Sequence, residues 1–394
     1  MTNHIDLLSP RDGETSRALV AEHGSPLLVL DCEVLRRAYR ELAGALPGVG
    51  LYYAVKSLPA PAVVSTLAAL GAGFDLASAG EVAMVQGLGI SPRRTIHTHP
   101  IKTDAEIRAA LRYGCTTFVV DNAYELQKLV RYRRRVGLLL RVSFRSPSAL
   151  VDLSRKFGCR PDGVEDLLTL AHNLGLHVKG FSFHVGSQST DPTSHVQAIE
   201  RCRQLFDAFR ERGRAPMSIL DIGGGFPVPY GRPGDAPVPG LAAFCEPIRA
   251  ALARLPGDLE VIAEPGRCLA APAVHLICTI VGKAERGDRL WYYLDEGVYG
   301  AFSGQIYDGV RYPLAVFGGS AVHERCVLAG PTCDSVDIVA EDVALPDLGL
   351  GEVVVASQMG AYTAASATEF NSLPRTRMVA LNESEVRTPA PVEA

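Results

Sequence analysis

One lysine stands out because it follows an apolar run. Lys56 ends the strongly apolar stretch of the segment YYAVKS (52–57). Burial disfavours the charged ammonium group and lowers its pKa, which makes the amine nucleophilic. Such a lysine can form a Schiff base with an aldehyde. The structural alternative is a lysine at the rim of a fold that takes part in a salt bridge.

Two glycine-containing motifs indicate that an anion binds. LDIGGGFP (220–227) places three glycines after an apolar run, and glycines let backbone N–H groups approach a phosphate closely. EPGR (264–267) adds Arg267, whose guanidinium group matches phosphate oxygens. Glu264 could keep a pyridine nitrogen protonated, or it could form a structural ion pair with Arg141 or Arg267. The glycines alone could also form an ordinary turn, and no G-K-[ST] follows as in a Walker loop.

A third motif, FHVGSQ (183–188), contains a histidine and a serine. The flat ring of His184 could stack on a cofactor, although a lone histidine is more often a structural residue. The Ser187 hydroxyl could donate to a phosphate or could cap a turn.

The cysteines are nine in number and contain no C-x-x-C pair, which argues against a disulfide framework and against a zinc site. We therefore expect no metal and a reducing, cytoplasmic location. Cys333 in GPTCDSVD is distinct, because the flanking Gly-Pro and Asp334 predict an exposed loop. There its thiol could serve as a proton donor.

The elements that must position these residues alternate between short apolar runs and longer alanine- and leucine-rich segments with helical spacing. Eight such alternations predict an α/β fold, a closed (β/α)8 barrel, in which the motifs at the strand ends meet on one face. The predicted strands are 51–55, 74–77, 95–97, 117–120, 138–142, 179–183, 218–222 and 261–264.

The pattern changes after residue 273, where β-rich stretches with glycine turns predominate. We predict a barrel over 31–273. A mostly antiparallel β domain is predicted over 1–30 and 274–394, and the segment PLLVL adds a strand to it.

Composition excludes several classes of protein. The 394 residues exceed one ordinary core, and 47% hydrophobic with 21% charged residues is typical of a globular protein. A net charge of -4 gives no attraction to nucleic acid or to an anionic membrane. No apolar run reaches the roughly 20 residues that a membrane span needs.

Taken in order, YAVKS, FDLAS, HVGSQ, LDIGGGFP, EPGR, GVYG, YDG, GPTCDSVD and GAYT resemble one family. They are similar to the alanine-racemase-like (fold type III) decarboxylases that use pyridoxal 5'-phosphate (PLP). Within that family the resemblance is to the ornithine/diaminopimelate/arginine decarboxylase group, and it is closest to ornithine decarboxylase. It covers residues 26–375.

The resemblance implies a role for each matching residue. Lys56 would bind the aldehyde of PLP, Glu264 would pair with the pyridine nitrogen, and His184 would stack on the ring. Asp75 and Arg141 would support the site around Lys56. The phosphate would be held by Ser187, Gly224, Gly225, Gly266, Arg267 and Tyr362. Cys333 would come from the partner subunit of a homodimer and protonate the product.

The resemblance also bears on the substrate, because Asp308 in YDG and Asp334 match the acidic pair that grips the distal ammonium in ornithine enzymes. Tyr299 and Tyr307 are expected to contact the substrate as well. L-ornithine, giving putrescine and CO2, is therefore favoured over diaminopimelate, whose distal carboxylate would face two aspartates.

Other substrates stay open. L-lysine has the same charges and one more methylene, which a pocket discriminates weakly, so lysine or dual specificity is an alternative, and arginine ranks after it. Two positions depart from the usual pattern of ornithine enzymes: Gln188 stands where glycine is usual, and His99 where asparagine is usual.

Two other classes of function remain as rivals. An amino-acid racemase on the same barrel would need a second acid/base on the opposite ring face and a smaller substrate pocket. A catalytically inactive regulatory relative would have lost cofactor contacts, whereas Lys56, Glu264, Arg267 and Cys333 are all present.

Overall fold

The computed structural model describes residues 6–7, 10–211, 217–230, 238–317 and 324–383. The chain forms two compact units. One unit, here called the barrel unit, comprises 36–227 and 238–268. The other, the β unit, comprises 1–35, 228–237 and 269–394.

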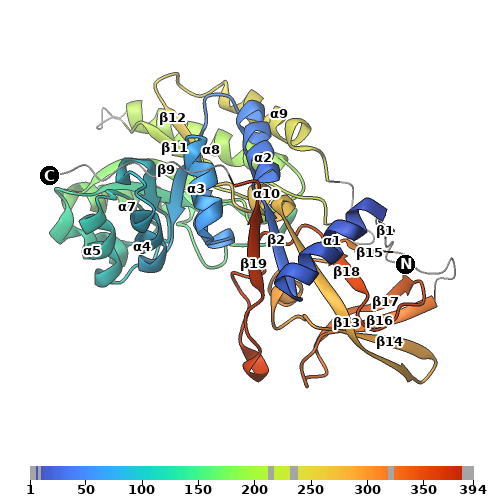
Figure 1. Ribbon diagram of the computed structural model, residues 1–394. Helices are drawn as coiled ribbons and strands as arrows, with labels where there is room; N and C mark the ends of the chain where they lie inside the picture. The colour runs from blue at the N-terminus through green and yellow to red at the C-terminus, as the bar shows by residue number, and fades with distance from the viewer. Residues whose placement is uncertain (1–5, 8–9, 212–216, 231–237, 318–323, 384–394) are drawn as a thin grey trace. The chain divides into compact units, whose positions relative to one another are not determined.

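The barrel unit contains a closed barrel of eight parallel strands, which confirms the predicted fold class (Figure 1). Each observed strand overlaps one of the eight predicted runs, and the bounds differ by two residues at most. The strands are β3 (Gly50–Ala54), β4 (Gly73–Leu76), β5 (Thr95–His97), β6 (Thr117–Val120), β7 (Gly137–Val142), β9 (His177–Phe183), β11 (Ile219–Asp221) and β12 (Glu260–Ala263).

Apolar side chains fill the inside of the barrel. Ile96, Val119, Leu139 and Ile262 come from four different strands and form one buried cluster, against which the partly buried Tyr52 packs. Because side chains alternate along a strand, these residues point inward while their neighbours face the surrounding helices. The interior is thus a packed core rather than a pore.

Helices follow the strands and surround the barrel; in Figure 1, α3, α4, α5 and α7 lie around its first half. The helices are α2 (Cys32–Ala45), α3 (Pro61–Ala69), α4 (Ala79–Gly87), α5 (Asp104–Tyr113), α6 (Ala123–Leu129), α7 (Val164–Asn173), α8 (Thr193–Glu211), α9 (Leu241–Leu252) and the short α10 (Arg267–Ala270).

Polar caps start several of these helices directly after a strand. Ser78, Thr103 and Asn122 each accept a hydrogen bond from the backbone N–H three residues further on. Thr103 and Glu106 form a full capping box. Such caps satisfy N–H groups that have no partner within the helix, and they fix the sharp turn from strand to helix.

The β unit contains a nine-stranded, mostly antiparallel sheet, as predicted. Its strands are β1 (Asp6–Leu7), β2 (Leu27–Asp31), β13 (Val274–Arg286), β14 (Arg289–Leu294), β15 (Leu314–Val316), β16 (Glu324–Ala329), β17 (Ile338–Leu345), β18 (Val353–Ala356) and β19 (Arg377–Leu381). The segment PLLVL supplies β2, which pairs with β13 and β19.

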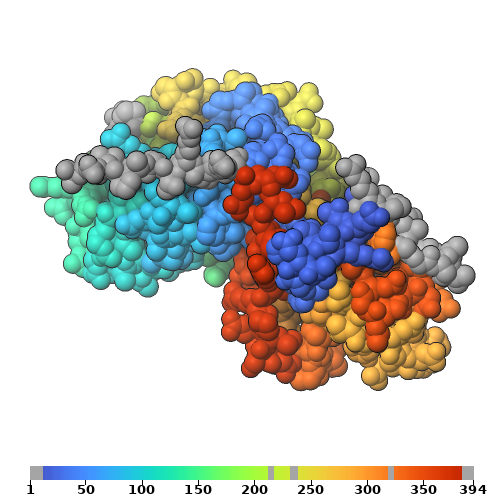
Figure 2. Space-filling model, in the orientation of Figure 1, coloured from blue at the N-terminus to red at the C-terminus, as the bar shows by residue number. Residues whose placement is uncertain are grey.

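Helix α1 (Pro10–His23) covers one face of this sheet, where Leu19 and Val20 pack on a buried cluster that includes Leu27 and Val355. Figure 2 shows the helix in dark blue on the surface of the β unit. Among the described residues, no helix is both long enough and apolar enough to cross a bilayer.

A glycine in β9 tests the close packing of the barrel. A Cβ added at Gly180 would lie 1.8 Å from the carbonyl oxygen of Ile219 on the neighbouring strand β11. Gly180→Ala must push two hydrogen-bonded strands apart, and we expect a loss of roughly 2–4 kcal/mol in the free energy of unfolding, measured by urea titration.

The matched control is Gly87→Ala in α4, where an added Cβ meets no atom within 4 Å. This change should stabilise the chain by about 0.5–1 kcal/mol, because alanine restricts the unfolded chain and favours the helix. Equal effects of the two substitutions would contradict the register of β9 and β11.

Candidate active site

Lys56 is fixed by a buried carboxylate. It lies in a single 3-10 turn (Val55–Ser57) directly after β3, and its Nζ forms an ion pair with Oδ2 of Asp75 on β4. The other oxygen of Asp75 accepts a hydrogen bond from the Thr98 hydroxyl. The Asp75 side chain is fully buried, whereas that of Lys56 is 36% exposed. Asp75 therefore fixes the ammonium group of Lys56, which stays accessible. The Lys56 side chain is less buried than the sequence suggested.

A second lysine near the barrel end is far more deeply buried. Lys102 is 1% exposed, and its Nζ donates to the carbonyl oxygens of His99, Pro100 and Val119 at 2.7–2.8 Å. Burial lowers its pKa to about 8, against the raising effect of Glu125. All three hydrogens of this ammonium have carbonyl partners, so Lys102 has a structural role.

Glu264 is buried and Arg141 is half-buried at the same end of the barrel. Glu264 follows β12 and is 8% exposed. Burial raises its pKa well above the usual value, and the charges of Asp221 and Asp75 raise it further, against the lowering effect of Lys56. Burial lowers the pKa of Arg141, while Glu264 is the strongest of the charges that oppose this. Arg141 also lies over the ring of Phe157, 5.3 Å from its centroid.

Ser187 and Arg267 meet although they are 80 residues apart in the sequence. Arg267 donates to the Ser187 hydroxyl through Nη2 at 2.9 Å and through Nε at 3.3 Å. Arg267 begins α10, is 5% exposed, and directly follows Gly266, where an added Cβ would lie 3.0 Å from the Ser57 side chain. A hydroxyl and a guanidinium at one point form a site for an anion.

The glycine motif forms a loop that no other residue type could form. Gly223 and Gly225 have φ values of +65° and +101°. A Cβ at Gly225 would lie 2.5 Å from the carbonyl oxygen of Gly186, and a Cβ at Gly224 would lie 2.7 Å from that of Glu264. The loop thus requires both left-handed backbone and the absence of side chains, which leaves its backbone open to a ligand.

His184 faces this loop as a neutral ring. Burial lowers its pKa well below the usual value, and the charges of Arg141 and Lys56 lower it further. The backbone N–H of Gly186 donates to Nδ1 at 3.0 Å, so Nε2 carries the ring hydrogen. A Cβ at Gly224 would lie 3.0 Å from this Nε2. The ring and the glycine loop therefore border the same space.

These barrel residues fit PLP. Ser187 and Arg267 offer an anion site, next to glycines where an added Cβ would obstruct the space. Lys56 offers an accessible amine, and Glu264 offers a buried carboxyl group for a ring nitrogen. The structure brings together all the cofactor-binding residues that the sequence predicts in the barrel unit.

The predicted proton donor belongs to the β unit. Cys333 lies in an exposed loop after β16, as predicted, and the other eight cysteines are buried. Its backbone N–H donates to Oδ1 of Asn371 at 3.2 Å, and Nδ2 of Asn371 donates to its Sγ at 3.4 Å. Asn371 has a left-handed φ of +56°, a conformation that asparagine tolerates better than most residues.

Asp334, next to Cys333, is held by an aromatic pair. The Tyr299 hydroxyl donates to its Oδ2 at 2.5 Å, and the ring of Tyr299 stacks on Phe370 with centroids 4.3 Å apart. This hydrogen bond lowers the pKa of Asp334, so the carboxylate is charged at neutral pH. Among the other predicted residues of the β unit, Asp308 and Tyr362 are half-buried, while Tyr307 is exposed. Their contacts with a substrate or a phosphate stay predictions.

The sequence analysis missed three residues that support the site. They are Thr98, which bonds Asp75; Asn371, which bonds Cys333; and His195, which is fully buried in α8. The His195 ring stacks on Phe226, and its Nε2 lies 3.1 Å from the carbonyl oxygen of Gly224. Thr98 lies in HTHPIK beside a predicted strand, which was a usable signal. Nothing local marks the other two, because their partners lie 29 and 38 residues away.

The two unusual positions have structural explanations. Gln188 is buried and has a φ of +54°, so the glycine that is usual in ornithine enzymes would adopt this backbone without strain. Nδ1 of His99 contacts the carbonyl oxygen of Ile101, and the ring lies edge-on to Phe157 at 5.6 Å. These contacts assign His99 to the structure of the loop.

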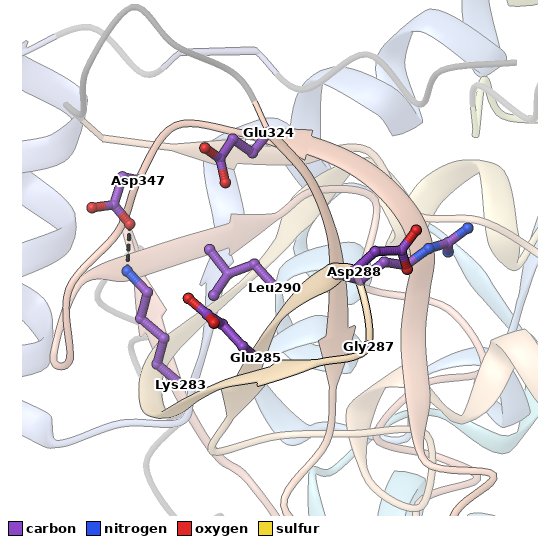
Figure 3. A pocket seen from close by; sticks show the side chains of 8 residues that line it. Lys283, Glu285, Gly287, Asp288, Leu290, Glu324 and Asp347 are labelled. Carbon is purple, nitrogen blue, oxygen red and sulfur yellow. Dashed lines mark hydrogen bonds and ion pairs between the residues drawn. The ribbon is translucent and has the colours of Figure 1, made fainter.

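A separate hollow of about 500 Å³ lies on the β unit beside the turn between β13 and β14 (Figure 3). Lys283 points across it to Asp347, with which it forms an ion pair. Four carboxylates and two cations make up most of its lining, and none of the predicted site residues lines it.

The barrel, its lysine and its anion site are those of a fold type III enzyme that uses PLP. Residues 32–271 match the family model described as "Pyridoxal-dependent decarboxylase, pyridoxal binding domain". The chain belongs to this family, in the group of ornithine, lysine and arginine decarboxylases, and it is a PLP-dependent decarboxylase of basic amino acids.

Individual relatives agree with this assignment. The lysine/ornithine decarboxylase of Selenomonas ruminantium is 39% identical over 347 residues, which cover 88% of this chain and 87% of the relative. The lysine/ornithine decarboxylase of Vibrio vulnificus has been solved with putrescine and with cadaverine. The two structures are 48% and 49% identical to this chain, with TM-scores of 0.90 and 0.91. Each comparison covers 96% of this chain and 100% of the other.

The Thr98 hydroxyl offers a test of how Lys56 is held. Thr98→Val removes the hydrogen bond to Asp75 and leaves one carboxylate oxygen buried without that donor. A hydrogen bond to a charged group is worth about 1.5–3 kcal/mol, so we expect the Kd for PLP to rise roughly 10- to 100-fold, measured by absorbance titration.

Thr95→Val is the matched control, because this threonine begins β5, the strand that Thr98 follows, but donates to the carbonyl oxygen of Pro92 at 2.7 Å. It should leave the Kd for PLP within about twofold of the wild-type value. If both variants bind PLP as the wild type does, Thr98 has no role in positioning the ion pair.

Proposed function

We propose that the chain decarboxylates L-ornithine to putrescine and CO2, and that L-lysine is its second substrate. The observation that carries this proposal is the charged carboxylate of Asp334, held by Tyr299 beside Cys333. An anionic contact at the distal end favours a side-chain ammonium and disfavours a distal carboxylate. Diaminopimelate therefore ranks last among the candidate substrates.

The comparisons support both substrates without separating them. The similar proteins of Selenomonas and Vibrio are named lysine/ornithine decarboxylases. Ornithine and lysine differ by one methylene, for which a pocket discriminates by about 1–3 kcal/mol. Two substrates with the same charges can thus share one acidic contact.

PLP, when bound, supplies an electron sink for the bond that loses CO2. In this proposal Lys56 would bind its aldehyde, Glu264 would pair with its ring nitrogen and His184 would cover its ring. The phosphate would be held by Gly224, Gly225, Gly266, Ser187, Arg267 and Tyr362. The work of the protein is to orient the scissile bond and to stabilise charge.

Substrate contacts in the proposal come from the β unit. Asp308 and Asp334 bind the distal ammonium, with Tyr299 and Tyr307 beside them. The Cys333 thiol then donates a proton to the product. Its exposed loop suits a residue that must act outside its own fold.

We further infer a homodimer in which Cys333 of each subunit serves the active site of the other. Exposed apolar side chains near Asp308 and Cys333 support an interface. They are those of Ile306, Tyr307 and Val336, which are 56–62% exposed. A cytoplasmic enzyme would fit the nine free thiols, which persist in a reducing compartment.

The substrate assignment is tested by CO2 release from the PLP-loaded protein. L-ornithine, L-lysine, L-arginine and meso-diaminopimelate are offered in parallel, with Lys56→Ala as the blank. We expect release from ornithine and lysine that is lost in the blank. Asp334→Asn should raise the KM for ornithine on the order of 10- to 100-fold, because the contact loses its charge.

Other outcomes would reject the proposal in different ways. Release from diaminopimelate alone would overturn the argument from charge. Formation of a D-amino acid without CO2 would indicate a racemase.

The shared active site is tested by mixing two inactive variants. Lys56→Ala and Cys333→Ala each lack one half of every site. Random exchange of subunits gives mixed dimers with one intact site, so the mixture should regain about a quarter of the wild-type activity. No recovery, with subunit exchange shown by native mass spectrometry, would place Lys56 and Cys333 of the same subunit in one site.

A further inference from the structure

Asp221, at the end of β11, is a buried carboxyl group that the proposed function does not use. It is 0% exposed. Its Oδ1 accepts the backbone N–H of Gly223 at 2.9 Å, which helps to form the glycine loop. Its Oδ2 is buried and meets no N–H or O–H donor among the described residues. The group that bonds to the Asp221 carboxyl is the carboxyl of Glu264.

Backbone contacts hold these two carboxyl groups together. β11 and β12 pair in parallel, with Asp221 opposite Ile262. The backbone N–H of Glu264 then donates to the carbonyl oxygen of Gly223 at 2.8 Å. The two side chains therefore leave adjacent strand ends that are fixed relative to each other.

Two carboxylates cannot share a hydrogen bond, so one of the pair must carry a proton. Burial raises the pKa of Asp221 to about 6 and that of Glu264 well above its usual value. Asp75, Lys56 and Arg141 are the other charged groups that act on the pair. Since Glu264 is the weaker acid, the proton of the ligand-free protein belongs to Glu264, and Asp221 is the anion.

We propose that Asp221 is a positioning residue that stores this proton when the cofactor binds. A protonated pyridine nitrogen beside Glu264 favours the Glu264 anion. The O–H bond of Glu264 then breaks and an O–H bond forms at the Asp221 carboxylate, along the hydrogen bond between the two carboxyl groups. The pair keeps one proton and one negative charge in both states, and no proton enters from solvent.

The advantage of storing the proton on Asp221 is electrostatic. When the pyridine nitrogen arrives already protonated, it cannot take the proton of Glu264, and without Asp221 as an acceptor Glu264 would have to release that proton from a buried site into water. With Asp221 the charge moves by the width of one hydrogen bond inside the protein. This inference rests on the proposed placement of the ring nitrogen at Glu264, but the proton in the ligand-free pair does not depend on the cofactor.

Infrared spectroscopy of the full chain at pH 7 tests the proposal, because a protonated carboxyl group absorbs apart from carboxylates. Labelling aspartate with 13C at the side-chain carboxyl shifts aspartic acid bands only. We expect no labelled acid band from the pair in the PLP-free protein and a labelled acid band after PLP is bound. Asp221→Asn, which can keep the bond to Gly223, should abolish that labelled band.

Two further variants complete the test. Glu264→Gln should remove one unlabelled acid band from the PLP-free protein while Asp221 is intact. Glu296→Gln is the control, because Glu296 is a buried acid of the β unit whose pKa burial also raises. It should leave the labelled band of the PLP-loaded protein unchanged.

Three results would overturn the proposal: no labelled acid band after loading, a labelled band of equal intensity before loading, or a labelled band that survives in Asp221→Asn. Failure of the protein to bind PLP at all would reject the proposed function instead. The Glu264→Gln comparison of the PLP-free protein would still test whether the pair holds a proton.

The pH dependence of stability provides a second measurement. A carboxyl group whose pKa is raised on folding binds more protons in the folded state, so its contribution to stability is full below its unfolded pKa and is lost as the pH rises. For Asp221 this window runs from 3.8 to about 6. The Tm of the PLP-free protein should fall across it less steeply in Asp221→Asn than in the wild type, and equal slopes would contradict the proposal.

Discussion

The structure of the site depends on burying an excess of carboxyl groups at the ends of the barrel strands. Asp75, Asp221 and Glu264 are each at most 8% exposed, and the cations that act on them are Lys56 and Arg141. Three charged carboxylates in this position would repel one another strongly. One proton, held between Asp221 and Glu264, resolves the imbalance and leaves Asp75 as the partner of Lys56.

The backbone, rather than side chains alone, fixes these charges. Gly223 links the pair, since its N–H binds Asp221 and its carbonyl oxygen binds the N–H of Glu264. The same loop, supported by His195 at the carbonyl oxygen of Gly224, forms the cradle next to Ser187 and Arg267. In the proposed site, a single turn thus joins the residues for the cofactor phosphate to the residue for its ring nitrogen. The loop tolerates no side chain at Gly224, because an added Cβ would lie 2.7 Å from the carbonyl oxygen of Glu264.

The sequence predicted the barrel well because its strands are short apolar runs that are followed by polar residues or glycines. The runs TIH (95–97) and TFVV (117–120) have the same bounds as β5 and β6. Several of these runs are followed by a residue whose side chain can carry out catalysis or bind phosphate, so Lys56, Glu264 and Arg267 could be named without coordinates. The supporting residues could not be named, because hydrogen bonds such as that from Thr98 to Asp75 depend on which strands are neighbours. Asn371 depends in addition on a left-handed turn that no local pattern specifies. In the β unit, the apolar pattern of β17 is interrupted by Glu341 and Asp342, which place charges inside the strand.

The central claim is that Lys56, and not the more deeply buried Lys102, binds the aldehyde of PLP. Both lysines lie in the barrel unit, but Asp75 leaves the Lys56 amine accessible while three carbonyl groups enclose that of Lys102. The most direct measurement is borohydride reduction of the PLP-loaded protein, followed by peptide mass spectrometry. The account predicts one pyridoxyl group on the peptide that contains Lys56. Its attachment to Lys102, or its absence from both lysines, would contradict the account.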